Sequence, residues 1–536
     1  MPSVRTKQRR STRACDFCHT RGTRCRQDNI EAVFGHVTCT TCVEYGEQCT
    51  WDRTPRKRGT KPGNASGLKK ATSWKRKVLN DRESISSLLD VYLDTIHPVF
   101  PLYCERELWV GWRASTFPES SSQYASLISM CALSAQHAQQ GSLFEDDRPL
   151  RELAASAEPY LTEATSLVLA QQPDVLDLEL IRSCGFLALF GIQTGNRTMI
   201  HKYLGMYHSV CAQFSLHDES HWDDIDDLSV CEIETRRRLY WAMYRLEVHS
   251  ACVLGHMIRL PEIQSNVNYP AGLHHPAFVP GRDGDFEDWF AGWNTTTDLY
   301  RILEHAIVDF RAARRRRTNV KAQSQSLKDM DLQQRLSEIQ IKALPQFDQA
   351  YEKSTDNGRN RCGFQATNIL FTIHMIRMFL SIGSQGETLE AAETLLESVQ
   401  KIPTAYIRAS GTPLLQEIAG TGLMLGATAA KASTVPEEAR RLLTLQDSLA
   451  AFLEMHASAN GTAISLASRL REQFSQLNNH LAHTDVPTGA DANNCEQLRD
   501  DAWDEDINEL FRFDPFSCET GIMPMHFRPG FLVDFA

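Results

Sequence analysis

Six cysteines near the start of the chain constrain its fold more than any other feature. They lie within 35 residues and repeat the spacing C-x2-C-x6-C on either side of a 13-residue loop: Cys15, Cys18, Cys25, Cys39, Cys42 and Cys49. A two-residue gap lets two thiolates chelate one ion from a single turn, and the third thiolate returns after six residues. Zinc takes four ligands in a tetrahedron and binds thiolates well. Six cysteines complete two such sites only if two sulfur atoms bridge both ions, so the pattern predicts two zinc ions in a module with an approximate internal two-fold.

A disulfide framework is the main alternative to a metal site. Residues 1–14 are basic and polar, with no apolar stretch behind them, so they do not look like a secretory signal. Cysteines of an intracellular protein stay reduced, which favours metal binding. Binding of a single zinc ion by four of the cysteines, with two spare thiols, is a further alternative. It would not explain why the C-x2-C-x6-C spacing occurs twice.

Charge is divided unevenly along the chain. Residues 1–80 contain 18 Lys/Arg and 6 Asp/Glu, a balance of +12, whereas residues 81–536 contain 38 and 61, a balance of −23. Six thiolates and two dications together carry −2, so the basic segment would keep about +10 with zinc bound. This asymmetry predicts a basic segment that meets a polyanion, attached to an acidic body that does not.

The two cysteine segments, residues 14–25 (ACDFCHTRGTRC) and 39–49 (CTTCVEYGEQC), resemble the fungal Zn2Cys6 binuclear-cluster transcription factors. The resemblance implies two short helices around a dizinc core, with Cys15 and Cys39 as the bridging ligands. It also implies that the first helix enters the major groove of double-stranded DNA, typically at GC-rich triplets such as CGG.

The candidate DNA contacts follow from the same resemblance. Arg21 and Arg24 match basic positions of the family's first helix, and arginine can bind guanine O6 and N7 or grip phosphates. His19 stands where the family often has arginine and is expected to contact phosphate. Exposure to solvent without a DNA contact is the alternative for each. Further candidates flank the cluster: Arg13, Arg56, Lys57 and Arg58.

Two departures from the family pattern bear on DNA readout. Gly22 stands where the family usually has a base-reading lysine, and the loop 26–38 is long and lacks the proline that commonly precedes the fourth cysteine. Neither change removes a zinc ligand. The alternative function is therefore a zinc-cluster protein that has lost specific base readout and acts through protein–protein contacts.

Residues 50–80 are predicted to form a basic linker, since Gly59, Pro62, Gly63 and Gly67 disfavour regular structure. Their two basic clusters are spaced like a bipartite nuclear localisation signal and could also follow the DNA backbone. A merely solvated linker is the alternative. No coiled-coil heptad follows it, so a homodimer is expected from the resemblance alone, and binding as a monomer stays open.

Residues 81–479 are predicted to form an all-α regulatory domain. Apolar residues at helical spacing predict helices over 84–96, 124–138, 178–190, 236–254, 366–382 and 442–453. Three segments, 88–101, 130–137 and 234–270, resemble the middle regulatory domain of fungal zinc-cluster proteins, and the likeness covers about residues 85–300. That domain is thought to regulate activity, by sensing a metabolite or a partner.

For single residues of this region we predict structural roles rather than functional ones. Arg236, Arg237 and Arg238 are expected to be a solvated helix start rather than an anion site, and Trp241 is expected in the core with its neighbours. The nine cysteines outside the cluster lack close pairs and are predicted to be buried free thiols. No apolar run reaches the ~18 residues of a membrane helix, and no phosphate loop or catalytic motif indicates an enzyme.

Residues 480–536 mix acidic residues with bulky aromatic ones. This composition predicts a disordered activation segment that recruits the transcription machinery, and docking on the protein's own body is the alternative. Together these features predict a nuclear, sequence-specific regulator of RNA polymerase II transcription, an activator of metabolic or secondary-metabolite genes.

Overall fold

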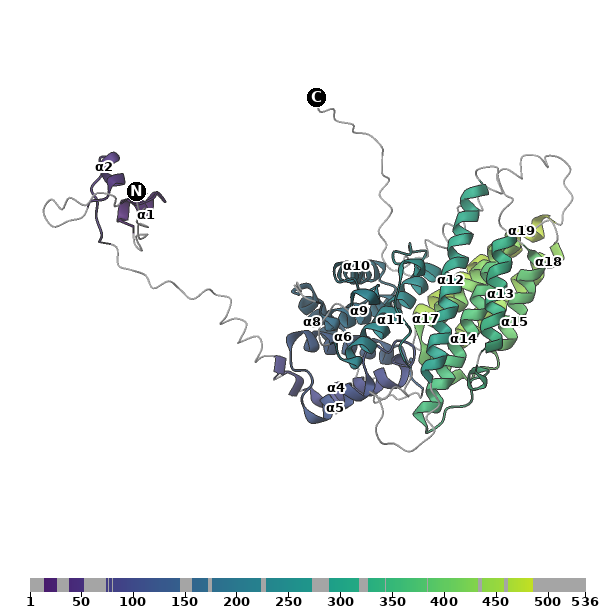
Figure 1. Cartoon of the computed structure of the whole chain (residues 1–536). Helices are drawn as coiled ribbons and strands as arrows, with labels where there is room; N and C mark the ends of the chain where they lie inside the picture. Colours follow the sequence, from purple (N-terminus) through teal and green to yellow (C-terminus); the bar gives the residue numbers. More distant parts are fainter. Residues whose placement is uncertain are drawn as a thin grey trace, which may run out of the picture. The chain divides into compact units, whose positions relative to one another are not determined.

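The chain divides into two compact units, Met1–Lys75 and Arg76–Ala536 (Figure 1). The computed structural model describes the following residues: 14–26, 38–52, 74–75, 77–79, 81–144, 157–171, 176–222, 228–271, 289–317, 326–342, 344–382, 384–431, 436–456 and 461–484. Within these ranges the regular elements are helical, and an isolated β-bridge joins Asp218 and Asn266. The predicted activation segment lies outside them from residue 485 onward.

The first unit has two short helices, α1 (Asp16–Thr20) and α2 (Thr40–Glu44). Helices of one turn bury too little apolar surface to hold a fold together. The buried core of this unit consists instead of cysteines, and Cys15, Cys18, Cys39 and Cys42 are all 0% exposed. The cysteine cluster therefore takes the place that a hydrophobic core has in a larger domain.

The second unit is a large assembly of helices. Its first part contains α4 (Arg82–Val91), the π-helical turn η1 (Tyr92–Ile96), α5 (Glu105–Ala114), α6 (Ser121–Gln139), α8 (Glu158–Leu169), α9 (Leu178–Thr194), α10 (Arg197–Gln213), η2 (Glu219–His221), α11 (Val230–Leu254) and η3 (Glu262–Gln264). Its second part contains α12 (Trp289–Arg317), α13 (Ser326–Lys342), η4 (Pro345–Phe347), α14 (Asn357–Ser381), α15 (Gln385–Val399), α16 (Thr404–Ser410), α17 (Thr412–Lys431), α18 (Pro436–His456) and α19 (Gly461–Thr484).

Each part of this unit packs around its own central helices. In the first part α9 lies between α6 and α10, and α8 packs on α6. In the second part α12 packs on α14, and α17 packs with both α18 and α19, as the long helices of Figure 1 show. Helices α9 and α11 both contact α17, so the two parts share one interior.

The six helices predicted from apolar periodicity are all present. They correspond to α4 with η1, α6, α9, α11, α14 and α18, and the all-α prediction is confirmed for the described residues. The first of them ends before Pro98, because proline has no N–H to continue the helical hydrogen bonds, although His97 before it still has helical backbone. Helix α19 continues to Thr484, a few residues past the predicted end of the domain at 479.

The prediction of a solvated arginine run at the start of α11 is wrong. The helix begins more than a turn earlier, and Arg236 and Arg238 are only 5% and 7% exposed. Arg237 forms ion pairs with Glu219 and Glu234. Nearly the whole of α11 is buried, because other helices surround it, and apolar periodicity alone cannot indicate such a position.

The other packing predictions are confirmed where the structure describes the residues. Trp241, Tyr244 and Leu246 are buried. The described cysteines of the second unit form no disulfide, and all but the half-buried Cys231 are buried as predicted: Cys104, Cys131, Cys184, Cys211, Cys252 and Cys362. Cys495 and Cys518 lie outside the described residues. None of the helices described is both long and apolar enough to cross a membrane.

Candidate metal centre

The two cysteine segments fold in the same way. Cys15 and Cys39 have extended backbone and cap the N-termini of α1 and α2. Each helix ends at a glycine in the left-handed region, Gly22 and Gly46, both with φ of +66°. Directly after Gly22, the Thr23 N–H donates to the Cys18 carbonyl at 3.0 Å. This is the 6→1 hydrogen bond of a Schellman cap. The equivalent bond follows Gly46, so the repeat in the sequence is also a repeat in the structure.

The sulfur atoms lie at the spacing that a zinc–thiolate site requires. The Sγ of Cys15 is 3.7 Å from that of Cys39 and 3.5 Å from that of Cys42, and Cys18 Sγ is 3.6 Å from Cys39 Sγ. A tetrahedron with Zn–S bonds of about 2.3 Å has edges of about 3.8 Å. A disulfide would bring two sulfur atoms to about 2.05 Å, and none of the six cysteines forms one. The spacing therefore fits a metal ion and not a disulfide framework.

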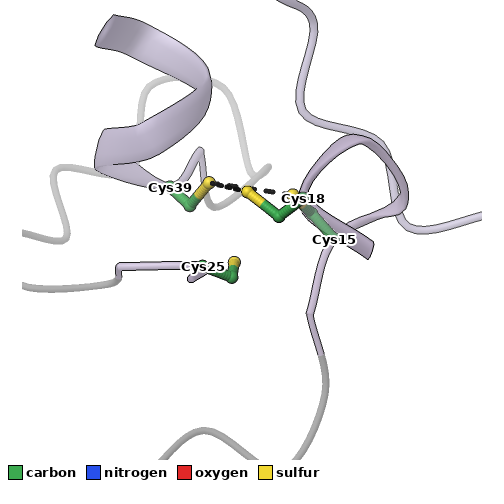
Figure 2. A group of neighbouring side chains, drawn as sticks. All are labelled: Cys15, Cys18, Cys25 and Cys39. Carbon is green, nitrogen blue, oxygen red and sulfur yellow. Dashed lines mark hydrogen bonds between the residues drawn. The ribbon is translucent and has the colours of Figure 1, made fainter. Parts of the chain in front are cut away.

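All six cysteines come together in two overlapping sets of four. One set is Cys15, Cys18, Cys25 and Cys39, and the other is Cys15, Cys39, Cys42 and Cys49. Within each set the sulfur atoms all lie within 4.8 Å of one another. Figure 2 shows the first set, with Cys15 and Cys18 beside one helix and Cys39 at the start of the other. The cluster could hold a metal ion, and Cys15 and Cys39 belong to both sets.

Without a metal these thiols oppose one another's ionisation. Burial raises the pKa of the Cys25 thiol to about 12 and also raises the pKa values of Cys18, Cys42 and Cys49. Cys15 is the exception: burial opposes its ionisation, but hydrogen bonds from neighbouring groups lower its pKa to about 6. A bound dication would remove the penalty for several thiolates side by side. The six cysteine thiols are therefore a suitable set of ligands for a dication that binds thiolates, such as zinc.

Hydrogen bonds that do not involve sulfur also join the two halves of the cysteine module. The Thr41 hydroxyl donates to the Arg24 carbonyl at 2.8 Å, which ties α2 to the end of the first half. In the other direction the Asp16 N–H donates to the Thr50 carbonyl at 2.9 Å, and the Asp16 carboxylate accepts from the Asp52 N–H at 2.7 Å. The Thr40 N–H donates in the same way to the Arg26 carbonyl at 2.9 Å. Asp16 and Thr40, each directly after the first cysteine of its half, are therefore equivalent, and the sequence pattern alone does not indicate these bonds.

The candidate DNA-binding residues that the structure describes are exposed. His19 lies on α1, Arg21 caps its C-terminus, and Arg24 lies in the segment that follows. The Arg21 guanidinium is 5.6 Å from the centre of the Phe17 ring, a cation–π contact that leaves its N–H edge available. The remaining candidates, Arg13, Arg56, Lys57 and Arg58, lie outside the described residues.

Gly22, the departure that put base readout in question, has a structural reason to be glycine. A side chain there would meet no atom within 4 Å, so space does not exclude it. The positive φ does disfavour it, because L-residues other than glycine rarely adopt left-handed backbone. Glycine therefore completes the helix cap in this chain.

The class of protein follows from a comparison with known families. Residues 89–275 match the family model described as the fungal specific transcription factor domain. The match begins within α4 and ends shortly after η3. Residues 89–275 thus carry this domain, and the resemblance seen in the sequence is confirmed.

Individual relatives are regulators of transcription. The chain is similar to transcription factor qa-1f of Neurospora crassa, with 33% identity over 87 residues, which are 16% of this chain and 10% of that protein. It is also similar to the glucose transport transcription regulator RGT1 of Candida glabrata, with 31% identity over 99 residues, 18% of this chain and 7% of that protein. The matched stretches span a tenth or less of these relatives.

Proposed function

We propose that this chain is a zinc-dependent, sequence-specific DNA-binding regulator of RNA polymerase II transcription. The observation that carries the proposal is the pair of four-sulfur sets that share Cys15 and Cys39, in a chain whose middle region is a fungal transcription factor domain. Each set would hold one zinc ion, and the two shared thiolates would bridge the ions. Four thiolates around each ion leave no position for water, so the zinc is structural rather than catalytic.

The module would read DNA through α1 and the turn that follows it. His19, Arg21 and Arg24 are exposed on one continuous stretch of chain, beside the buried cysteines that fix its shape. The arginines can bind guanine edges or phosphates, and the basic linker can add phosphate contacts that carry no sequence information. GC-rich triplets are the expected targets.

The other parts of the proposal concern residues that the structure describes only in part or not at all; of the second basic cluster it describes Lys75 and Lys77. The basic clusters of residues 50–80 would direct the protein to the nucleus. The acidic and aromatic residues of 480–536 would contact the transcription machinery, which makes an activator the favoured role.

DNA binding by the zinc-loaded full-length chain tests the proposal. Fluorescence anisotropy with a GC-rich duplex pool should give binding that weakens at least tenfold after chelation and returns when zinc is added back. Cys25→Ser should weaken binding in the same way, whereas Cys231→Ser, which changes a thiol of the second unit, should leave it unchanged. Binding that survives both chelation and Cys25→Ser would contradict the proposal.

A further inference from the structure

A cavity of about 50 Å³ lies where the two parts of the second unit meet. Its walls come from η1, α6, α9 and α11, which precede residue 275, and from α12, α14, α16 and α17, which follow it. The region matched by the family model therefore supplies only part of the cavity, and the later helices complete it.

Arg245 of α11 is the most unusual residue of the cavity wall. It is only 2% exposed, and its Nε and Nη1 atoms have no hydrogen-bond partner among the described residues. Its guanidinium lies 4.9 Å from the centre of the Trp293 ring and 5.2 Å from that of Tyr300. Aromatic rings stabilise the face of a guanidinium, but they do not satisfy its N–H edge. Burial lowers the pKa of Arg245 to about 10, so the side chain is still charged at neutral pH.

A buried charge normally has an opposite charge hydrogen-bonded to it. Glu417 is the carboxylate of the cavity wall, but its Oε1 accepts from His249 Nδ1 at 3.1 Å and from the Tyr300 hydroxyl at 3.3 Å. No hydrogen bond joins Glu417 to Arg245 in the part of the chain that the structure describes. Glu417 thus lowers the local positive charge without pairing with the guanidinium edge.

The other unpaired groups of the wall are two donors and two acceptors. Asn368 Nδ2 and Ser410 Oγ are buried without a partner in the described structure. The unpaired acceptors are Gln193 Oε1 and, with the proton on Nδ1 facing Glu417, His249 Nε2. Water could satisfy these groups singly, but it could not neutralise Arg245. An anion that accepts several hydrogen bonds would satisfy the two donors and neutralise Arg245.

We propose that this cavity binds a small carboxylate of the size of acetate or glycolate, with Arg245 as its charge partner. A carboxylate matches the two N–H groups of one guanidinium. The cavity volume is far below the 300–1,000 Å³ typical of sites for larger ligands, so only a few non-hydrogen atoms fit. A hydroxyl beside the carboxylate, as in glycolate, would donate to Gln193 Oε1. A doubly charged phosphate fits less well, because it would meet one arginine and the Glu417 carboxylate.

Such a ligand would connect the two parts of the second unit. Arg245 lies on α11, whereas Asn368 lies on α14 and Ser410 at the end of α16. A carboxylate bound to all three would stabilise the packed arrangement against its separation. This inference concerns the second unit alone and does not depend on zinc or DNA binding.

Ligand-dependent stability of the full-length chain tests this site. Thermal unfolding would be followed by circular dichroism in sodium acetate or sodium glycolate, with sodium chloride and acetamide as controls at matched ionic strength. Each carboxylate at about ten times its Kd should raise the midpoint by roughly 2 °C relative to both controls. Saturation-transfer NMR should detect the acetate methyl group on the protein.

Arg245→Met supplies the decisive variant, since an apolar side chain of similar length removes a buried charge and should permit folding. It should abolish both the carboxylate-specific shift and the NMR signal. Arg311→Met is the matched control, because Arg311 donates to the Ala251 carbonyl at 2.9 Å and does not line the cavity. Ser410→Ala should weaken acetate binding about fivefold, and it carries the test if Arg245→Met fails to fold.

Equal midpoints in acetate, acetamide and chloride, with no NMR signal, would mean that the cavity holds water only and would overturn the proposal. A carboxylate effect that persists in Arg245→Met would also overturn it, because the binding would then lie elsewhere.

Discussion

The Sγ atoms of Cys15 and Cys39 lie 3.7 Å apart, and each of these cysteines caps the helix that begins its half of the module. Both belong to the two four-sulfur sets, whereas every other cysteine of the cluster belongs to one. The shared pair is what allows six thiolates to complete two tetrahedral sites.

Replacing a cysteine that belongs to both four-sulfur sets should release more zinc than replacing a cysteine that belongs to one. Cys15→Ser removes a ligand from both sets, and Cys25→Ser removes a ligand from one. Native mass spectrometry of the full-length chain should find two zinc ions in the wild type, close to none in Cys15→Ser and about one in Cys25→Ser. Cys231→Ser should retain both ions. Equal metal loss in the two cluster variants would argue against bridging by Cys15.

The glycines that end the two short helices provide a matched pair of substitutions. Gly22→Lys and Gly46→Lys should each destabilise the module by about 1 kcal/mol, because each puts a side chain on left-handed backbone, without a steric clash. Competition with a zinc chelator would measure this as roughly fivefold weaker zinc retention in both variants. Only Gly22→Lys should also change the DNA sequence preferred, since Gly22 follows the helix that we propose faces DNA. A change of preference in Gly46→Lys would contradict that assignment.

In the second unit, the ion pair between Glu105 and Arg361 should make stability depend on pH. Its two hydrogen bonds are both 2.7 Å long. Burial alone would raise the pKa of Glu105, but the bonds to Arg361 outweigh burial and hold it below its usual value. A lowered folded-state pKa gives stability that is present above the unfolded-state pKa and is lost as pH falls through the folded-state value.

Urea unfolding would measure this contribution. Glu105→Gln should cost about 1 kcal/mol at pH 7, since the pair is partly exposed, and the difference from wild type should shrink below about pH 4. Glu393→Gln breaks the more exposed pair with Arg441 and should cost nothing measurable. A cost for Glu105→Gln that does not change with pH would contradict the assignment to the ion pair.

The sequence was most informative where few arrangements satisfy the chemistry. Zinc–thiolate sites require cysteines at short, regular spacings. The spacing from Cys15 to Cys49 is therefore enough to predict that the six sulfur atoms come together in the folded module. Apolar periodicity predicted the main helices for a similar reason, since a buried stripe recurs along one helix.

The sequence was least informative where a polar residue is buried by helices that are remote in the chain. Arg236 and Arg238 look like solvent-facing residues until the packing around α11 is known. No sequence pattern marks Arg245, because the groups around it, from Gln193 to Glu417, come together only in the folded unit. Local patterns contain no information about such neighbours.

Selection of bound sequences from random duplex DNA tests the central claim most directly. The zinc-loaded full-length chain would be compared with Cys25→Ser and Arg21→Ala in the same selection. We expect one defined motif to be enriched by the wild type, to be lost with Cys25→Ser, and to be relaxed at one position with Arg21→Ala. Salt-sensitive binding without any sequence preference would contradict the claim and support a zinc-cluster protein that has lost base readout.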